Sequence, residues 1–245
     1  GVVRGIMVTE ARTRAMTDAG FWVDKTIVDY LDEALARHPD KVFVTDHNST
    51  TGRSTSLSYR QLDRLSRRIA GSLIDLGVAP GDVVAVQLPN WWEVAAIHLA
   101  CVRIGAVTNP LQPIFRAREL EFMLAFADTK IMFVPRVFRG FEYLPMIEGL
   151  RDGLPALAHV FAVGGDIADT FSFEARFIDQ RWEDDPTLDT VIAERTLQPN
   201  DVAEICYTSG TTGQPKGVMH TYNTLVACTG STRSLGFGEH SVILM

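Results

Sequence analysis

A loop rich in glycine and hydroxyl side chains lies near the end of the sequence, in the stretch "YTSGTTGQPKG" from Tyr207 to Gly217. Apolar segments precede and follow it, so the pattern predicts a strand, a loop and a second strand. Glycine tolerates positive φ and lets a ligand approach the backbone, so successive N–H groups can point toward an anion. The hydroxyls add donors, and Lys216 adds a mobile positive charge that suits phosphate oxygens. The residue types therefore predict a phosphate-binding loop.

Two other interpretations of this loop are a P-loop, which the spacing of its residues tests, and a plain surface loop. The P-loop of nucleoside triphosphatases needs a second glycine and then a Ser or Thr after its lysine, but here Pro215 and Gly217 take those places, counting from Gly210. The spacing therefore excludes a P-loop of that kind. A plain surface loop remains the alternative, because clusters of Gly, Ser and Thr usually have no other role.

Charge and cysteine usage limit the possible partners. The formal net charge is −7 and no run of Lys or Arg occurs, so the basic patch of a nucleic-acid binder is missing. The cysteines, Cys101, Cys206 and Cys228, are widely spaced and form no CxxC pair, which predicts neither disulfides nor a zinc site and fits a reducing cytoplasm. The most apolar stretch is interrupted by His98 and Arg103 and is too short to span a bilayer. We expect a cytoplasmic globular protein without nucleic acid, metal ligands or an integral membrane span.

The elements that must position the loop follow from periodicity and caps. A helix is predicted after Thr26, which forms a capping box with Asp29, and a longer one after Ser58, whose partner is Gln61. Gly77 ends the second helix. Further helices are predicted at 91–104 with Asn90 as the cap, at 116–127 and near 142–151; strands are predicted at 41–46, 83–88, 130–135 and 159–165.

Strand and helix therefore alternate along much of the chain. This order predicts an α/β fold, a mainly parallel sheet with helices on both faces. Residues 166–199 are acidic and aromatic and are predicted to be a surface excursion, with the "EDD" cluster at 183–185 as a solvated face.

Three residues that could do chemistry have a plainer interpretation. Cys206 is predicted to be a small buried hydrophobe and not a nucleophile, because no His or other base lies at a recognisable offset. Trp91 and Trp92 stand at the start of a helix, and we expect them to pack against neighbouring elements and not to bind a cofactor.

The loop has a known counterpart. The eleven residues "YTSGTTGQPKG" resemble the phosphate-binding signature of the adenylate-forming superfamily, which includes acyl-CoA and aryl-CoA synthetases, luciferases and adenylation domains of peptide synthetases. The segment from Leu57 to Pro113 is similar to the N-terminal region of the same family. The resemblance covers the chain from about Thr26 onward.

What the resemblance implies is an enzyme, an AMP-forming acid–CoA ligase. A carboxylate would attack the α-phosphorus of ATP to give an acyl-adenylate and pyrophosphate, and CoA, as co-substrate, would then accept the acyl group. Mg²⁺ would accompany ATP. The resemblance assigns the phosphates to Lys216, which is also the catalytic candidate, and to the following loop residues: Thr208, Ser209, Gly210, Thr211, Thr212 and Gly213.

Downstream of the loop, His220 and Tyr222 fall where members of the superfamily line the acid pocket, although Tyr222 stands where many of them carry a histidine. Both residues could equally be core residues at the end of a strand. The segments "AGFWVDKTIVDYL" and "MHTYNTL" look closest to CoA ligases for alicyclic, aryl or medium-chain acids.

The resemblance also predicts the domain organisation. Residues 1–25 are expected to be an N-terminal tail, and residues 26–245 an incomplete N-terminal AMP-binding domain that lacks the rest of that domain and the C-terminal lid. We expect the chain to be inactive by itself. The rival hypotheses are an acyl-AMP ligase or carrier-protein adenylation domain that does not use CoA, and a short non-catalytic binding module.

Overall fold

A computed structural model describes residues 8–165, 167–195, 197–208, 215–234, 236, 238 and 241–242. Its α-helices are α1 (Glu10–Asp18), α2 (Ile27–Arg37), α3 (Tyr59–Asp75), α4 (Trp92–Ile104), α5 (Ala117–Phe126), α6 (Leu144–Glu148), α7 (Leu188–Ala193) and α8 (Tyr222–Ser234). The strands are β1 (Val42–Asn48), β2 (Arg53–Ser58), β3 (Val83–Val86), β4 (Val107–Pro110), β5 (Thr129–Pro135), β6 (Val137–Phe138), β7 (Phe141–Glu142), β8 (His159–Val163), β9 (Val202–Thr208) and β10 (Lys216–Thr221). Short helical turns occupy Arg151–Gly153, Asp169–Phe171, Glu174–Ile178 and Trp182–Asp184.

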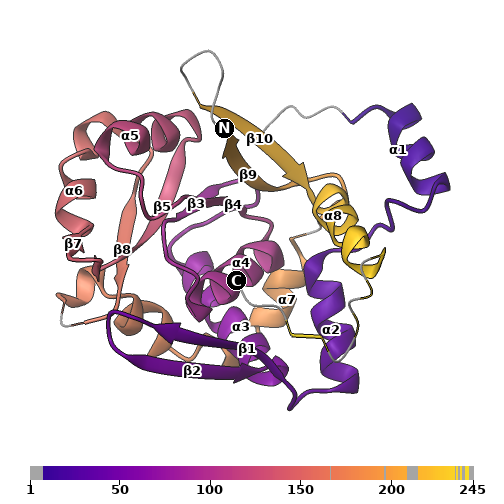
Figure 1. Cartoon of the computed structure of the whole chain (residues 1–245), viewed down its shortest axis with the longest axis horizontal. Coiled ribbons are helices and arrows are strands. Elements are labelled where there is room, and N and C mark those ends of the chain that lie inside the picture. The colour runs from indigo at the N-terminus through magenta and orange to yellow at the C-terminus, as the bar shows by residue number, and fades with distance from the viewer. Residues whose placement is uncertain are drawn as a thin grey trace.

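Over the described ranges, the central sheet has six strands in the order β10, β9, β4, β3, β5 and β8 (Figure 1). Every neighbouring pair is parallel except β10 with β9, which is antiparallel. Helices cover both faces, so the predicted α/β fold with a mainly parallel sheet is confirmed. The hairpins β1–β2 and β6–β7 form separate two-stranded sheets. Of their strands, only β1 is predicted from the sequence.

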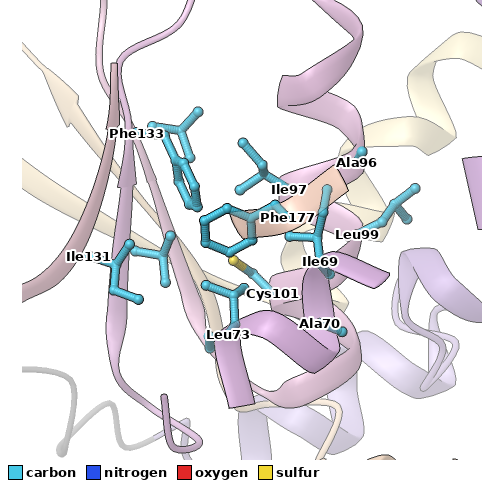
Figure 2. Packing of buried hydrophobic residues seen from close by; sticks show 14 of the residues in the cluster. Ile69, Ala70, Leu73, Ala96, Ile97, Leu99, Cys101, Ile131, Phe133 and Phe177 are labelled. Carbon is cyan, nitrogen blue, oxygen red and sulfur yellow. The ribbon is translucent and has the colours of Figure 1, made fainter. Parts of the chain in front are cut away.

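The sheet is buried on both sides because its central strands are apolar throughout. Val84 and Val86 of β3 belong to a core with α3 and α4, whereas Ala85 belongs to a second core with α5 and α6. Figure 2 shows the first core, where Ile69 of α3 and Ile97 of α4 point toward the sheet. A strand covered on both faces reads as a continuous apolar run, which is why β3 was recognisable.

The two predicted capping boxes are confirmed. Thr26 and Asp29 exchange hydrogen bonds at the start of α2, and Ser58 and Gln61 do so at the start of α3. One face of α3 is buried, and Leu62 and Ile69 on it have no exposed surface. These caps satisfy backbone donors that the first helical turn leaves without partners.

The predicted cap of α4 is wrong. Trp91, not Asn90, is the N-cap residue, and its side chain caps nothing. The buried carboxylate of Asp46 on β1 takes over: its Oδ2 accepts a hydrogen bond from the N–H of Trp92 at 3.0 Å, and its Oδ1 accepts one from the N–H of Thr55 at 3.3 Å. A negative charge at this position also complements the partial positive charge of the helix N-terminus.

Replacing Asp46 by alanine should therefore destabilise the fold by about 1–2 kcal/mol, because a helix cap and a hydrogen bond inside the β1–β2 hairpin are both lost. The control is Asn90→Ala, which changes the exposed residue that the sequence marks as the cap and should cost less than about 0.5 kcal/mol. Urea unfolding of both variants measures the difference. Equal destabilisation of the two would contradict the long-range cap.

The region predicted as a surface excursion is in part a core element, so that prediction is corrected. Phe173 and Phe177 are buried against α3, α4 and the sheet. In the "EDD" cluster the Glu183 side chain is only 5% exposed and pairs with Arg64 and Arg68 of α3. Burial raises the pKa of Glu183, but hydrogen bonds from the two arginines outweigh it and hold the pKa at about 2. The prediction of a surface segment is wrong because the aromatic side chains of this segment are buried in the core.

The predicted packing of the tryptophans is confirmed. The ring of Trp91 meets Phe138 edge-on at a centroid distance of 6.2 Å, and Trp92 meets Phe173 at 6.5 Å. The segment expected to be an N-terminal tail contains α1 and the buried Trp22, which is 2% exposed.

Candidate functional site

The candidate site is the end of the β9–β10 hairpin. Thr208, the last residue of β9, lies directly opposite Lys216, the first residue of β10. Both side chains are exposed. The two residues therefore flank the connecting loop, in agreement with the predicted strand, loop and strand. We call this loop end of the hairpin, where Thr208 and Lys216 stand opposite each other, the hairpin mouth. Ser209, Gly210, Thr211, Thr212 and Gly213 lie outside the described residues, so their assignment to phosphate remains a prediction.

Strand pairing determines which side chains lie on the same face of the β9–β10 hairpin as Lys216. Directly opposite residues of an antiparallel pair point to the same side, and side chains alternate along each strand. The pairs Thr208–Lys216, Cys206–Val218 and Glu204–His220 follow at two-residue intervals. One face of the hairpin thus carries the hairpin mouth at one end and the polar pair Glu204–His220 roughly 14 Å away, four residues along β10.

Glu204 belongs to a polar row that crosses three strands and reaches α4. Thr108 of β4 is its partner in the parallel ladder, and the Nδ1 atom of His98 lies 3.0 Å from the Thr108 hydroxyl oxygen. The same His98 atom is 4.0 Å from Glu204 Oε2. Burial lowers the pKa of His98, and the charge of Glu204 opposes that shift. No role is predicted for Glu204 or His98 from the sequence. The feature that could have identified them is a charged or polar residue inside an otherwise apolar strand or helix.

Cys206 lies beside this row and has the environment of an inert thiol. Its Sγ donates a hydrogen bond to Glu204 Oε1 at 2.9 Å, and the side chain is half-buried. Burial, together with the adjacent carboxylate, raises the pKa of Cys206 to about 12. Because the thiolate is the reactive form, these surroundings support the prediction that Cys206 is not a nucleophile.

Alkylation should therefore distinguish Cys206 from the exposed Cys228. With iodoacetamide at pH 8, we expect Cys206 to be modified at least about tenfold more slowly, because a pKa near 12 leaves few thiolates. Peptide mass spectrometry over a time course gives the two rates. Replacing Glu204 by Gln removes the adjacent negative charge and should accelerate modification of Cys206 but not of Cys228. Equal rates for the two cysteines in the unchanged protein would contradict the inert environment.

The two predicted pocket residues lie in different surroundings. His220 is half-buried on the same hairpin face as Lys216. Tyr222 is only 1% exposed, contributes to a core cluster with Val102 and Ala203, and its hydroxyl has no hydrogen-bond partner in the described part of the chain. Burial raises the pKa of Tyr222. The structure thus brings His220 to the site face and Tyr222 to the core, and a role of either in an acid pocket stays a prediction.

An apolar cavity of about 280 Å³ lies between α2, α4 and the β1 strand, lined by residues that include Tyr30, Phe43 and His98. None of the described residues of the β9–β10 hairpin lines it. We therefore do not assign this cavity to the phosphate site.

Two further findings bear on ligands and membranes. In the described ranges, no group of three or more His, Cys, Asp or Glu residues could hold a metal ion. Within the same ranges, no helix has both the length and the apolar character that crossing a membrane requires.

Fold and site together define an α/β protein whose central sheet ends in an antiparallel hairpin with a lysine at its mouth. The AMP-binding enzyme family matches residues 31–245. The chain therefore belongs to this family of adenylate-forming acid ligases.

Individual relatives agree with this placement. The chain is 34% identical over 218 residues to a medium-chain fatty-acid–CoA ligase of Escherichia coli (strain K12), a match that covers 89% of this chain and 37% of that protein. It is 33% identical over 215 residues to a salicyl-AMP ligase/salicyl-S-ArCP synthetase of Mycobacterium tuberculosis, covering 88% of this chain and 36% of that protein. The apo structure of Mycobacterium smegmatis MbtA superimposes with a TM-score of 0.79 at 28% identity, over 96% of this chain and 41% of that one. The chain thus spans little more than a third of the length of these relatives.

Proposed function

We propose that this chain is the N-terminal part of an AMP-forming acid–CoA ligase. A carboxylate oxygen of the acid attacks the α-phosphorus of ATP, the bond from that phosphorus to the bridging oxygen breaks, and pyrophosphate leaves with the electron pair. The sulfur of CoA then attacks the acyl carbonyl and AMP leaves. The observation that carries this proposal is the placement of Thr208 and Lys216 opposite each other at the two ends of a Gly- and hydroxyl-rich loop.

The chemistry asks the protein mainly for alignment and charge compensation, because an anion must approach a polyanion. Lys216 is exposed at the hairpin mouth, so its ammonium group is available to the β- and γ-phosphates. The Thr208 hydroxyl on the opposite strand adds a donor to the same anion. These contacts would hold the pyrophosphate moiety in line with the attacking carboxylate.

Mg²⁺ in such sites is commonly bound by substrate phosphates with one or two carboxylates. The expectation that Mg²⁺ accompanies ATP stays a prediction. ATP, CoA and a small carboxylic acid are the proposed partners, and the cytoplasm is the proposed location.

The main alternative to this proposal concerns the acceptor of the acyl group. Relatives include a medium-chain fatty-acid–CoA ligase and an acetyl-coenzyme A synthetase, but also a 2,3-dihydroxybenzoate-AMP ligase of Bacillus subtilis (strain 168). An enzyme that stops at the acyl-adenylate or transfers to a carrier protein is therefore the second candidate. The names of these relatives favour medium-chain and aryl acids as the first substrates to test.

The test is ATP–pyrophosphate exchange with a panel of medium-chain, alicyclic and aryl acids, in the full-length protein that carries this chain. We expect exchange that depends on one class of acid, followed by AMP release and thioester formation when CoA is added. Exchange without a CoA product would support the alternative acceptor. No exchange with any acid, from a folded protein, would contradict the adenylating function itself.

A further inference from the structure

The β9–β10 hairpin joins the rest of the sheet through a short hydrogen-bonded ladder and through apolar packing, in which Val202 and Ile205 are buried beside Val107. It forms one end of the sheet, and the ladder between β9 and β4 contains the single residue pair Thr108–Glu204. On its other face, the hydroxyl of Tyr207 donates a hydrogen bond to the carbonyl of Met123 at 2.8 Å. Because the ladder contains so few hydrogen bonds, side-chain contacts contribute to holding the hairpin in position.

One such contact lies where β10 passes into α8, seven residues after Lys216. The side chain of Asn223 accepts a hydrogen bond from the N–H of Asp24 at 3.1 Å and donates one to Asp24 Oδ1 at 3.0 Å. It also donates to Asn200 Oδ1 at 3.2 Å, and its own N–H donates to the carbonyl of Pro199 at 3.0 Å. This amide therefore joins the N-terminal segment, the segment before β9 and the end of β10 at one point.

Forming this contact costs free energy, because it buries polar groups and holds Asp24 in an uncommon backbone conformation. We therefore regard it as a specific feature of the fold. Asn223 has no exposed surface, so both polar atoms of its side chain depend on these protein partners. Asp24 adopts a φ of 54°, in the left-handed region that non-glycine residues seldom occupy. Asp is among the residues that tolerate this region, and here the conformation presents its N–H and its carboxylate to the same amide.

The N-terminal partner in this contact is outside the family match. The AMP-binding family matches residues 31–245, whereas α1 and Asp24 precede it. We call residues 8–26 the N-terminal arm. The arm is fixed at further points, since Trp22 is buried and the hydroxyl of Thr13 lies 3.5 Å from Asn200 Nδ2.

We propose that the N-terminal arm positions the phosphate-binding hairpin: through Asp24 and Asn223 it fixes the end of β10 and so sets where Lys216 stands relative to ATP. Asp24 and Asn223 are positioning residues that do not touch the substrate. The inference rests on the proposed function for its kinetic consequence, but its structural consequence can be measured without activity.

The experiment exchanges the carboxylate and the amide between positions 24 and 223. Asn223→Asp places a carboxylate against that of Asp24, which removes the donor and adds repulsion. Asp24→Asn combined with Asn223→Asp restores an amide donor opposite a carboxylate acceptor, and Asn at position 24 still tolerates positive φ. The control is Asn48→Asp, the same chemical change at the remote β1–β2 turn, where the side-chain oxygen accepts from the N–H groups of Thr50 and Thr51 and can still do so as a carboxylate.

Two readouts are compared in the full-length protein. Hydrogen–deuterium exchange of the β9–β10 amides should be at least about fivefold faster in Asn223→Asp than in the unchanged protein, with β3 and β5 unaffected, and the double variant should recover most of the difference. In ATP–pyrophosphate exchange, KM for ATP should rise at least about fivefold in Asn223→Asp and return toward the original value in the double variant, while Asn48→Asp changes neither readout.

Three results would overturn the proposal: faster exchange spread equally over the whole sheet, absence of recovery in the double variant, or a loosened hairpin with an unchanged KM for ATP. If the unchanged protein shows no pyrophosphate exchange at all, the proposed function fails. The deuterium readout still decides whether the arm restrains the hairpin.

Discussion

Replacing Lys216 by alanine is expected to lower the rate of ATP–pyrophosphate exchange by roughly tenfold to a hundredfold. A charge-assisted hydrogen bond to phosphate contributes on the order of 1.5–3 kcal/mol, and the rate falls by the corresponding factor where that contact is formed in the transition state. Lys216 is exposed at the mouth of the hairpin, so the fold should not depend on it. The measurement is exchange kinetics of the full-length protein, with thermal unfolding recorded beside it.

The control for Lys216 is Lys41→Ala, which removes an equal charge from an exposed position directly before β1, outside the N-terminal arm. Its exchange rate should remain within about twofold of the unchanged protein, because interactions of exposed charges contribute little. An unchanged rate in Lys216→Ala would remove Lys216 from the phosphate site. A large loss of thermal stability in that variant would instead show that its effect on rate is structural.

The second large effect concerns Glu93, in the first turn of α4. The side chain is buried and its Oε2 has no hydrogen-bond partner within the described residues. Burial raises its pKa to about 8, while a hydrogen bond from its own N–H lowers it and the neighbouring charges of Asp46 and Glu174 raise it further. The folded protein therefore keeps this proton in a range of pH where the unfolded chain has lost it.

Glu93→Gln should accordingly change how stability depends on pH. Between the ordinary pKa of 4.5 and the raised value of about 8, the unfolded state binds fewer protons, so the stability of the unchanged protein falls as pH rises. The loss is about 1.4 kcal/mol for each pH unit and is on the order of 5 kcal/mol in total, and it is complete above pH 8. Glutamine has no proton to lose and should abolish this part of the dependence.

Urea unfolding at intervals from pH 5 to pH 9 measures the difference between the two proteins. The free energy of unfolding of Glu93→Gln, relative to that of the unchanged protein, should increase with pH up to about 8 and then remain constant. The control is Glu121→Gln on α5, where the carboxylate is exposed and its removal uncovers no buried charge. Parallel stability curves for Glu93→Gln and the unchanged protein would show that the Glu93 carboxyl is solvated in the folded state.

The sequence by itself determined features that depend on neighbours three or four residues apart or on alternation along a strand. The capping boxes at Thr26 and Ser58, the apolar strand β3 and the loop that ends at Lys216 are of this kind. Each depends on backbone groups within one turn of helix or one run of strand, so the local pattern is sufficient. The alternation of strands and helices then allowed the mainly parallel sheet to be predicted.

Only the tertiary structure decided the contacts that join distant segments. Asp46 caps α4 from a strand 46 residues earlier, and Asp24 meets Asn223 across 199 positions. The polar row at Glu204 exists because three strands pair in one register beneath His98. Local sequence cannot predict such partners, because register and burial are properties of the assembled sheet: a shift of one residue would turn Glu204 and Lys216 to the opposite face.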